Sequence, residues 1–187
     1  MTRIDIMANE RLFDDRHHLH EFQELWANGP VAFVFLRQFG SVFAVRQAQS
    51  LNRYYDEIVA AGAKVVFIGL GTSIQGFTFR KRTETRFLVL TTHDQTLYRT
   101  MGLWRSRGGT IAPSNLETWA RLIREGVYPY QRTGDPYQLG GAFVVTAGGR
   151  EVTWDFRAHK ASDIAPAVDL AKALIGAALG SPAGVAT

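Results

Sequence analysis

A continuous apolar run, followed by a tight turn and a helix start, constrains the fold of this chain most. Residues 31–36 read Val-Ala-Phe-Val-Phe-Leu between turn-forming residues, a pattern typical of a strand buried on both faces of a sheet. Gly40 supplies the turn, and Ser41 is a good N-cap for a helix that we expect to reach Ala61. A strand covered on both sides indicates an α/β protein.

Strands and helices alternate along the rest of the chain. We predict further strands at residues 64–70, 86–91, 142–146 and 151–156, and the last two form a hairpin across Ala147-Gly-Gly149. We expect helices or helical turns at residues 20–27, 74–80 and 95–101.

Two further helices are predicted from their capping residues. Ser114-Asn-Leu-Glu117 has the spacing of a capping box, and it opens a helix whose apolar face consists of Leu116, Trp119, Ala120 and Ile123. Asp163 caps the last helix, which tolerates Pro166 in its first turn.

The order of these elements predicts the topology. A β-α-β-α-β unit followed by a hairpin and a helix implies parallel strands joined by right-handed crossovers, with antiparallel strands added to the same sheet. This is a thioredoxin-like three-layer α/β/α arrangement around a central mixed sheet. We expect a single domain over residues 1–187, with its core at about 20–178, a loop-rich insertion at 104–141 and a flexible tail at 180–187.

The chain contains no cysteine, which excludes whole classes of function. Thiol–disulfide exchange, thiol-dependent peroxide reduction, a disulfide framework and a zinc–thiolate site all require that side chain. No apolar run approaches the roughly 18 residues that span a bilayer, and the first ten residues lack the pattern of a secretory signal. We therefore expect a cytoplasmic protein with no membrane partner.

The basic residues are mostly arginine, since lysine occurs only at positions 64, 81, 160 and 172. The formal net charge is +4, and arginine suits fixed, bidentate recognition of anions. A GC-rich genome explains the same bias without any function. No basic block is interleaved with aromatic residues, so we expect no nucleic-acid partner.

Several segments together resemble a known family. Their order and spacing are similar to those of peroxiredoxin-like proteins of the AhpC/TSA antioxidant group over about residues 20–178. The matching segments are Leu25-Trp-Ala-Asn-Gly-Pro-Val-Ala-Phe-Val-Phe-Leu-Arg-Gln-Phe-Gly40, Lys64-Val-Val-Phe-Ile-Gly-Leu-Gly71, Asp94 with Tyr98 and Gly102-Leu103, Asp135-Pro-Tyr-Gln-Leu-Gly-Gly-Ala-Phe-Val-Val145, and Gly148-Gly149.

The resemblance implies a thioredoxin fold and a redox-active Cys-x-x-Cys pair at positions 41 and 44. This chain has Ser41-Val-Phe-Ala44 instead, so the fold carries over and the thiol chemistry does not. The two cysteine positions carry different residues, serine and alanine. Deliberate engineering usually replaces both cysteines with the same residue, so this difference favours natural loss.

The turn at residues 39–46 has no thiol, but it has other features that suit a bound anion. The free backbone N–H groups of residues 42–44 point out of a helix N-terminus, where the macrodipole favours negative charge. As catalytic residues we predict Arg37 and Arg46 as anchors, Ser41 as a hydrogen-bond donor, and His93, at the end of the third strand, as a general acid or base. The alternatives are that Ser41 only caps the helix, that both arginines pair with surface carboxylates, and that the His93-Asp94 turn is structural.

The stretch from residue 104 to 137 combines aromatic and arginine side chains, as a binding loop or lid often does. The predicted substrate-binding residues around it and the turn are Phe39, Phe43, Trp104, Arg107, Tyr137 and Gln138. The alternatives are a satellite core with solvent-facing arginines, and a homodimer interface.

We predict no metal and no cofactor. The triplet His17-His18-x-His20 lacks an obvious carboxylate partner and reads as a solvated turn. Gly69-Leu-Gly71 is not a dinucleotide fingerprint, and nothing points to flavin, nicotinamide or haem.

The leading hypothesis is a redox-inactive protein that binds a small aromatic or anionic molecule. It transforms that substrate by cofactor-independent acid–base chemistry, such as an isomerisation or cyclisation in a biosynthetic tailoring step. The alternatives are a non-catalytic, dimeric binding or regulatory domain, and a cysteine-less variant of a thiol peroxidase or oxidoreductase.

Overall fold

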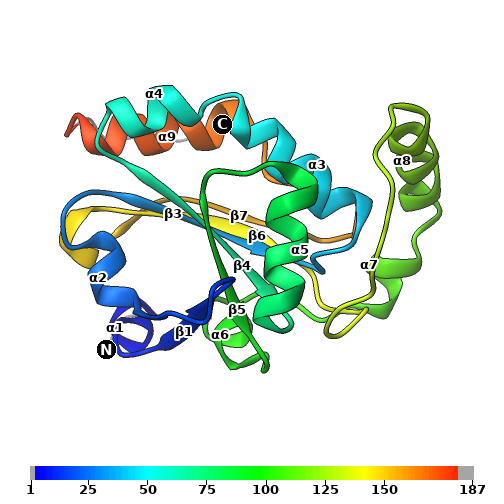
Figure 1. Cartoon of the computed structure of the whole chain (residues 1–187), viewed down its shortest axis with the longest axis horizontal. Helices are drawn as coiled ribbons and strands as arrows, with labels where there is room; N and C mark the ends of the chain where they lie inside the picture. The colour runs from blue at the N-terminus through cyan, green and yellow to red at the C-terminus, as the bar shows by residue number, and fades with distance from the viewer. Residues whose placement is uncertain (1–2, 181–187) are drawn as a thin grey trace.

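The computed structural model describes residues 3–180 and contains a mixed sheet between two layers of helices (Figure 1). Seven strands pair in the order β2-β1-β5-β4-β3-β6-β7. They are β1 (Arg11–Asp14), β2 (Leu19–Glu21), β3 (Val31–Leu36), β4 (Lys64–Leu70), β5 (Leu88–Thr92), β6 (Gly141–Val145) and β7 (Val152–Arg157). Strands β3, β4 and β5 are parallel, and the outer strands pair antiparallel. The predicted three-layer α/β/α arrangement around a mixed sheet is confirmed.

Helices cover both faces of this sheet (Figure 1). In chain order they are α1 (Arg3–Ala8), α2 (Phe22–Trp26), α3 (Val42–Asn52), α4 (Tyr55–Ala60), α5 (Ser73–Thr83), α6 (Thr96–Thr100), α7 (Arg107–Ile111), α8 (Pro113–Arg124), the short 3-10 helix η1 (Ala147–Gly149) and α9 (Ala167–Ala178). Within residues 3–180, no helix has the length and apolar character that crossing a bilayer requires.

Strand β3 shows why the sheet needs both layers. Val34 and Leu36 pack in one cluster with side chains of α3, α4, α5 and α9, whereas Phe33 and Phe35 pack in another with α1, α2 and α6. Successive side chains of a strand point to opposite faces, so a run that is apolar at every position must be covered twice. All six residues of β3 are buried, as the sequence predicts.

The N-terminal hairpin was not predicted. Strands β1 and β2 pair with each other, and β1 also pairs with β5 at the edge of the sheet. Both are short, and β1 reads Arg-Leu-Phe-Asp with only alternate residues buried. The helix expected at residues 20–27 therefore begins only at Phe22, because residues 19–21 belong to β2.

The long helix expected up to Ala61 is two helices. Helix α3 ends at Asn52, and α4 begins at Tyr55 after a break at residues 53–54. The other expected elements are present with bounds that differ by a few residues, and the predicted strand at 86–91 is β5 at 88–92.

Two predicted helix caps are wrong. Helix α8 begins at Pro113, with Ala112 at the N-cap position and no side-chain cap. Proline fits the first turn because it lacks the N–H that would be unsatisfied there. Asp163 instead accepts hydrogen bonds from the backbone N–H groups of residues 159 and 160, and α9 starts after Pro166. A capping box does occur between Thr72 and Gln75 at the start of α5.

The insertion at 104–141 carries helices α7 and α8, and α8 stands at one end of the molecule in Figure 1. Its predicted apolar face is largely uncovered, since Leu116 is 68% and Trp119 40% exposed. Leu122, on another face of the helix, is buried. The tail predicted at 180–187 lies, from residue 181 on, outside the described residues.

Candidate functional site

The turn between β3 and α3 is fixed by hydrogen bonds on both sides. The Ser41 hydroxyl oxygen accepts a hydrogen bond of 3.1 Å from the backbone N–H of Ala44, so the predicted N-cap is confirmed. From the opposite side, the Thr133 hydroxyl oxygen accepts from the backbone N–H of Phe39 at 3.0 Å. Tyr130 donates twice, from its backbone N–H to the Gly40 carbonyl and from its hydroxyl to the Phe39 carbonyl, each at 3.1 Å.

Gly40 allows the segment at residues 130–133 to approach this closely. A Cβ atom at position 40 would lie 1.8 Å from the carbonyl oxygen of Gln131, a distance at which backbone must move. The turn and the end of the insertion are therefore held in direct contact, and the insertion has a fixed place beside the turn.

Arg37 follows β3 directly and has an incompletely satisfied guanidinium. Its Nη2 donates to the Pro136 carbonyl at 2.7 Å, but its buried Nε has no hydrogen-bond partner within the described residues. Burial lowers the pKa of the Arg37 guanidinium, and the nearby carboxylate of Asp135 opposes that shift. An unpaired buried N–H costs about 1–3 kcal/mol, so this group favours a bound acceptor.

A groove of about 390 Å³ separates the turn from helices α7 and α8. Among the described residues that line it, Arg37 is the one charged side chain, and the rest are apolar or neutral polar groups. The lining residues are Arg37, Phe43, Thr110, Ile111, Ala112, Asn115, Leu116, Trp119 and Ala161. A smaller cavity of about 30 Å³ adjoins Arg37 and Phe43, and Lys160 and Asp163 are among its lining residues.

Asn115 anchors the far wall of this groove. Its Nδ2 donates to the carbonyls of Gly109 at 2.7 Å and Thr110 at 2.9 Å, and its Oδ1 accepts from the backbone N–H of Ser162 at 2.9 Å. These bonds tie α7 and α8 to the loop before α9. Nothing in the sequence distinguishes Asn115 from a surface asparagine, so its role was not predicted.

The structure does not bring the two predicted arginine anchors together. Arg46 forms an ion pair with Glu125 at the end of α8, and it does not line the groove. Pairing with a carboxylate was the alternative for both arginines, and the structure shows that pairing for Arg46. Arg37 binds a backbone carbonyl instead.

Phe43 lines the groove, whereas Phe39 does not. The Phe39 side chain is fully buried, with its ring over Gly69 and 5.4 Å from the ring of Phe79. It belongs to the core beneath the turn rather than to a binding wall. His93 is exposed after β5 and also does not line the groove, and the neighbouring Asp94 accepts from the backbone N–H of Thr96 at the start of α6.

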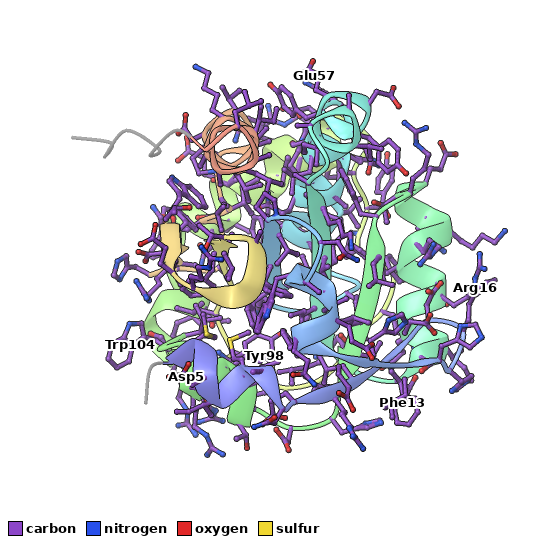
Figure 2. All side chains as sticks on the ribbon, turned by 90° about the vertical axis from the view of Figure 1, so that its left-hand side faces the viewer. Asp5, Phe13, Arg16, Glu57, Tyr98 and Trp104 are labelled. Atoms are coloured by element: carbon purple, nitrogen blue, oxygen red, sulfur yellow. The ribbon has the colours of Figure 1, made fainter. Side chains whose placement is uncertain are left out.

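The remaining predicted substrate-binding residues lie elsewhere on the insertion. Trp104 is 63% exposed and points to the surface in Figure 2. The ring of Tyr137 lies 5.3 Å from the guanidinium of Arg107, and Gln138 is buried with its Nε2 donating to three backbone carbonyls. Gln138 thus stabilises the loop. The groove is lined instead by Ile111, Leu116 and Trp119.

The histidine triplet has the carboxylate partner that its sequence pattern did not reveal. Asp14 Oδ2 lies 3.3 Å from His18 Nδ1 and 3.2 Å from His20 Nε2, which corrects the expectation of an unpartnered turn. No group of three or more side chains suited to hold a metal ion occurs within residues 3–180.

Asp14 makes stability depend on pH. Burial raises its pKa, but hydrogen bonds from the backbone N–H groups of His18 and Arg16 and from the two imidazoles outweigh it, so the pKa lies below its usual value. A lowered pKa contributes stability above the unfolded-state value, and that contribution is lost as the pH falls through the folded value. We expect Asp14→Asn to lower the free energy of unfolding by about 2 kcal/mol at pH 7. Urea titrations should show the difference from wild type shrinking below about pH 4, and an equal difference at pH 2.5 would contradict this role.

Comparison with known proteins places these observations in a family. The family model described as AhpC/TSA antioxidant enzyme matches residues 50–160. The chain belongs to this family. In this chain residues 41 and 44, which precede the matched segment, are serine and alanine, and no cysteine is present.

The chain is also similar to named relatives in sequence and to solved structures in fold. A prostamide/prostaglandin F synthase of Salmo salar is 26% identical over 160 residues, covering 82% of this chain and 78% of that protein. The protein of the same name from Aquarana catesbeiana is 29% identical over the same coverage. The Mycobacterium tuberculosis peroxidoxin BcpB superimposes with a TM-score of 0.64 at 15% identity, covering 91% of this chain and 92% of BcpB. Peroxiredoxin Q of Xanthomonas campestris gives 0.66 at 13% identity, covering 94% and 93%. The predicted thioredoxin-like fold is confirmed.

Proposed function

We propose that this chain binds a small organic molecule with a flat apolar body and an anionic group, in the groove between the β3–α3 turn and helices α7 and α8. The observation that carries this proposal is the buried Nε of Arg37, which lacks a partner within the described residues at the wall of an otherwise uncharged groove. An anionic oxygen at that wall would neutralise the guanidinium charge, and a small shift of the Arg37 side chain would bring the Nε donor within reach of it.

The size and lining of the groove support a small ligand. About 390 Å³ lies within the range of small-molecule sites, which combine apolar walls with a few fixed polar groups. Phe43 of α3 and Trp119 of α8 contribute aromatic surface to the groove. The Pro136 carbonyl holds the guanidinium of Arg37, so little side-chain freedom is lost on binding.

We also propose that any reaction at this site is a redox-free rearrangement, such as an isomerisation or cyclisation. Arg37 would stabilise negative charge on an enolate or carboxylate oxygen as that charge develops. It is the one ionisable side chain among the described residues that line the groove, so it acts as an electrostatic stabiliser rather than as a base. Proton transfer would involve Lys160 or Asp163 in the adjoining cavity, or the substrate itself.

The names of the relatives suggest the substrate class to try first. Those proteins are named for making prostaglandin F and prostamides, and we extend to this chain only the expectation of an oxygenated, largely apolar molecule. The thiols that the family resemblance implies are absent, so we do not extend a thiol-dependent step.

A pair of fluorescent probes tests the proposal. Anilinonaphthalene sulfonate carries a flat apolar body and an anion, whereas phenylnaphthylamine has a similar body without charge. We expect Arg37→Gln to weaken binding of the sulfonate about tenfold and to leave the neutral probe unaffected, because only the anion uses the guanidinium. Fluorescence titration measures both affinities.

Arg132→Gln is the matched control, because Arg132 is exposed and does not line the groove. It should change neither affinity. Equal affinities of wild type and Arg37→Gln for the sulfonate would refute the proposal, and so would equal losses for the two probes.

A non-catalytic binding domain that forms dimers is a second candidate. The exposed side chains of Ile111 and Leu116 would then be covered by a partner surface rather than by a small molecule. Sedimentation velocity separates the candidates, since this alternative requires a dimer that Leu116→Glu disrupts, and the groove proposal requires none.

A further inference from the structure

A second hollow lies between helices α3 and α8 and measures about 290 Å³. It shares Phe43 with the groove but not Arg37. Helix α8 presents Leu116 and Trp119 to the groove, and Thr118 and Arg121 to this cleft. The two sites are therefore neighbours on different faces of one helix.

The charge in the α3–α8 cleft is positive. Arg46 comes from α3 and Arg121 from α8, so each of the two helices contributes one arginine to the lining of the hollow. Arg46 pairs with Glu125 through Nη2, and its side chain is only 21% exposed. A guanidinium has five N–H donors in a planar fork, so one carboxylate leaves donors available. Arg121 forms no ion pair in the part of the chain that the structure describes.

Hydroxyl groups complete the polar lining. Ser50, Thr118 and Ser162 all line the cleft above an apolar floor of Phe43, Leu122 and Ile164. The Thr118 hydroxyl donates to the Ser114 carbonyl at 3.1 Å. Between residues 3 and 180, the hydroxyls of Ser50 and Ser162 have no assigned hydrogen bond and are available as donors.

We propose that the α3–α8 cleft binds a phosphoryl group. Two arginines and two serines with available hydroxyls line one hollow, which suits a tetrahedral oxyanion that accepts several hydrogen bonds at once. Arg46 and Arg121 together with Glu125 leave one positive charge to attract the anion. The same chemistry serves free phosphate and the phosphate ester of a small molecule.

Inorganic phosphate and phenyl phosphate are the probes, titrated into the whole 187-residue chain by isothermal calorimetry at constant ionic strength. We expect saturable binding that Arg121→Gln weakens about tenfold. Arg121 is exposed, so its loss leaves the fold intact. Glu125→Gln should strengthen binding several-fold, because it removes the carboxylate that competes for Arg46.

Arg124→Gln is the matched control, because it removes the same charge from α8 outside the cleft. It should leave the affinity unchanged. The proposal is overturned if Arg124→Gln and Arg121→Gln weaken binding equally, which indicates nonspecific attraction, or if phosphate does not bind. Tighter binding of phenyl phosphate supports a phosphorylated small molecule, whereas equal affinities support free phosphate. Arg37→Gln should not alter phosphate binding, so this inference and the proposed function fail independently.

Discussion

Gly40→Ala is expected to destabilise the protein strongly, by about 3 kcal/mol or more. The added methyl would lie 1.8 Å from the carbonyl oxygen of Gln131, so either the turn or the segment over it must move. That movement would also break the hydrogen bonds that Tyr130 makes to the turn. Thermal unfolding should show a midpoint lower by roughly 10 °C.

Gly108→Ala is the control for this change. A Cβ atom at position 108 meets no atom within 4 Å, and the residue lies in helix α7. Alanine has the higher helix propensity, so this variant should be as stable as wild type or slightly more stable. If Gly40→Ala has the same midpoint of thermal unfolding as the wild type, residues 130–133 are not in close contact with the turn.

Replacing Ser41 and Ala44 together with cysteine should produce a reversible disulfide where the wild type has no thiol. Residues three apart at a helix start are within disulfide range, and the helix N-terminus lowers the pKa of a thiol placed there. One equivalent of peroxide should oxidise the two thiols to one disulfide and release two waters. Thiol titration before and after peroxide gives two thiols per chain and then none.

The rate of that oxidation separates repurposing from simple loss of the thiols. Arg37 is directed to Pro136 and the groove, so we expect a rate only slightly above that of a free dithiol, the gain that a lowered thiol pKa gives. The affinity for anilinonaphthalene sulfonate should equal that of the wild type. Oxidation far faster than that of a free dithiol would favour the third hypothesis, a thiol peroxidase that has only lost its cysteines. The Ser41→Cys single variant is the control, because it cannot form an intramolecular disulfide.

The central sheet could be predicted because its signals are local. Strand β3 is apolar at every position, and the segments that follow it alternate between strand and helix patterns. Strand β1 could not be recognised, because four residues with two charged side chains gain strand structure only by pairing with β5 and β2. Its stability comes from contacts that lie far apart in the sequence.

The candidate site was predictable only in part, for a related reason. Arg37 and Phe43 lie beside the turn in sequence and were predicted. Helical spacing also placed Leu116 and Trp119 on one face of α8, but periodicity cannot tell whether such a face meets the core or a hollow. In this protein it faces the groove, because Asn115 ties α8 to α7 and, through the distant backbone N–H of Ser162, to the loop before α9.

A crystal structure of the complex with anilinonaphthalene sulfonate tests the central claim most directly. We expect the sulfonate within hydrogen-bond distance of the Arg37 Nε and the aromatic body between Phe43 and Trp119. A probe bound elsewhere, or a groove closed by α8 with Arg37 Nε paired to protein, would contradict the account.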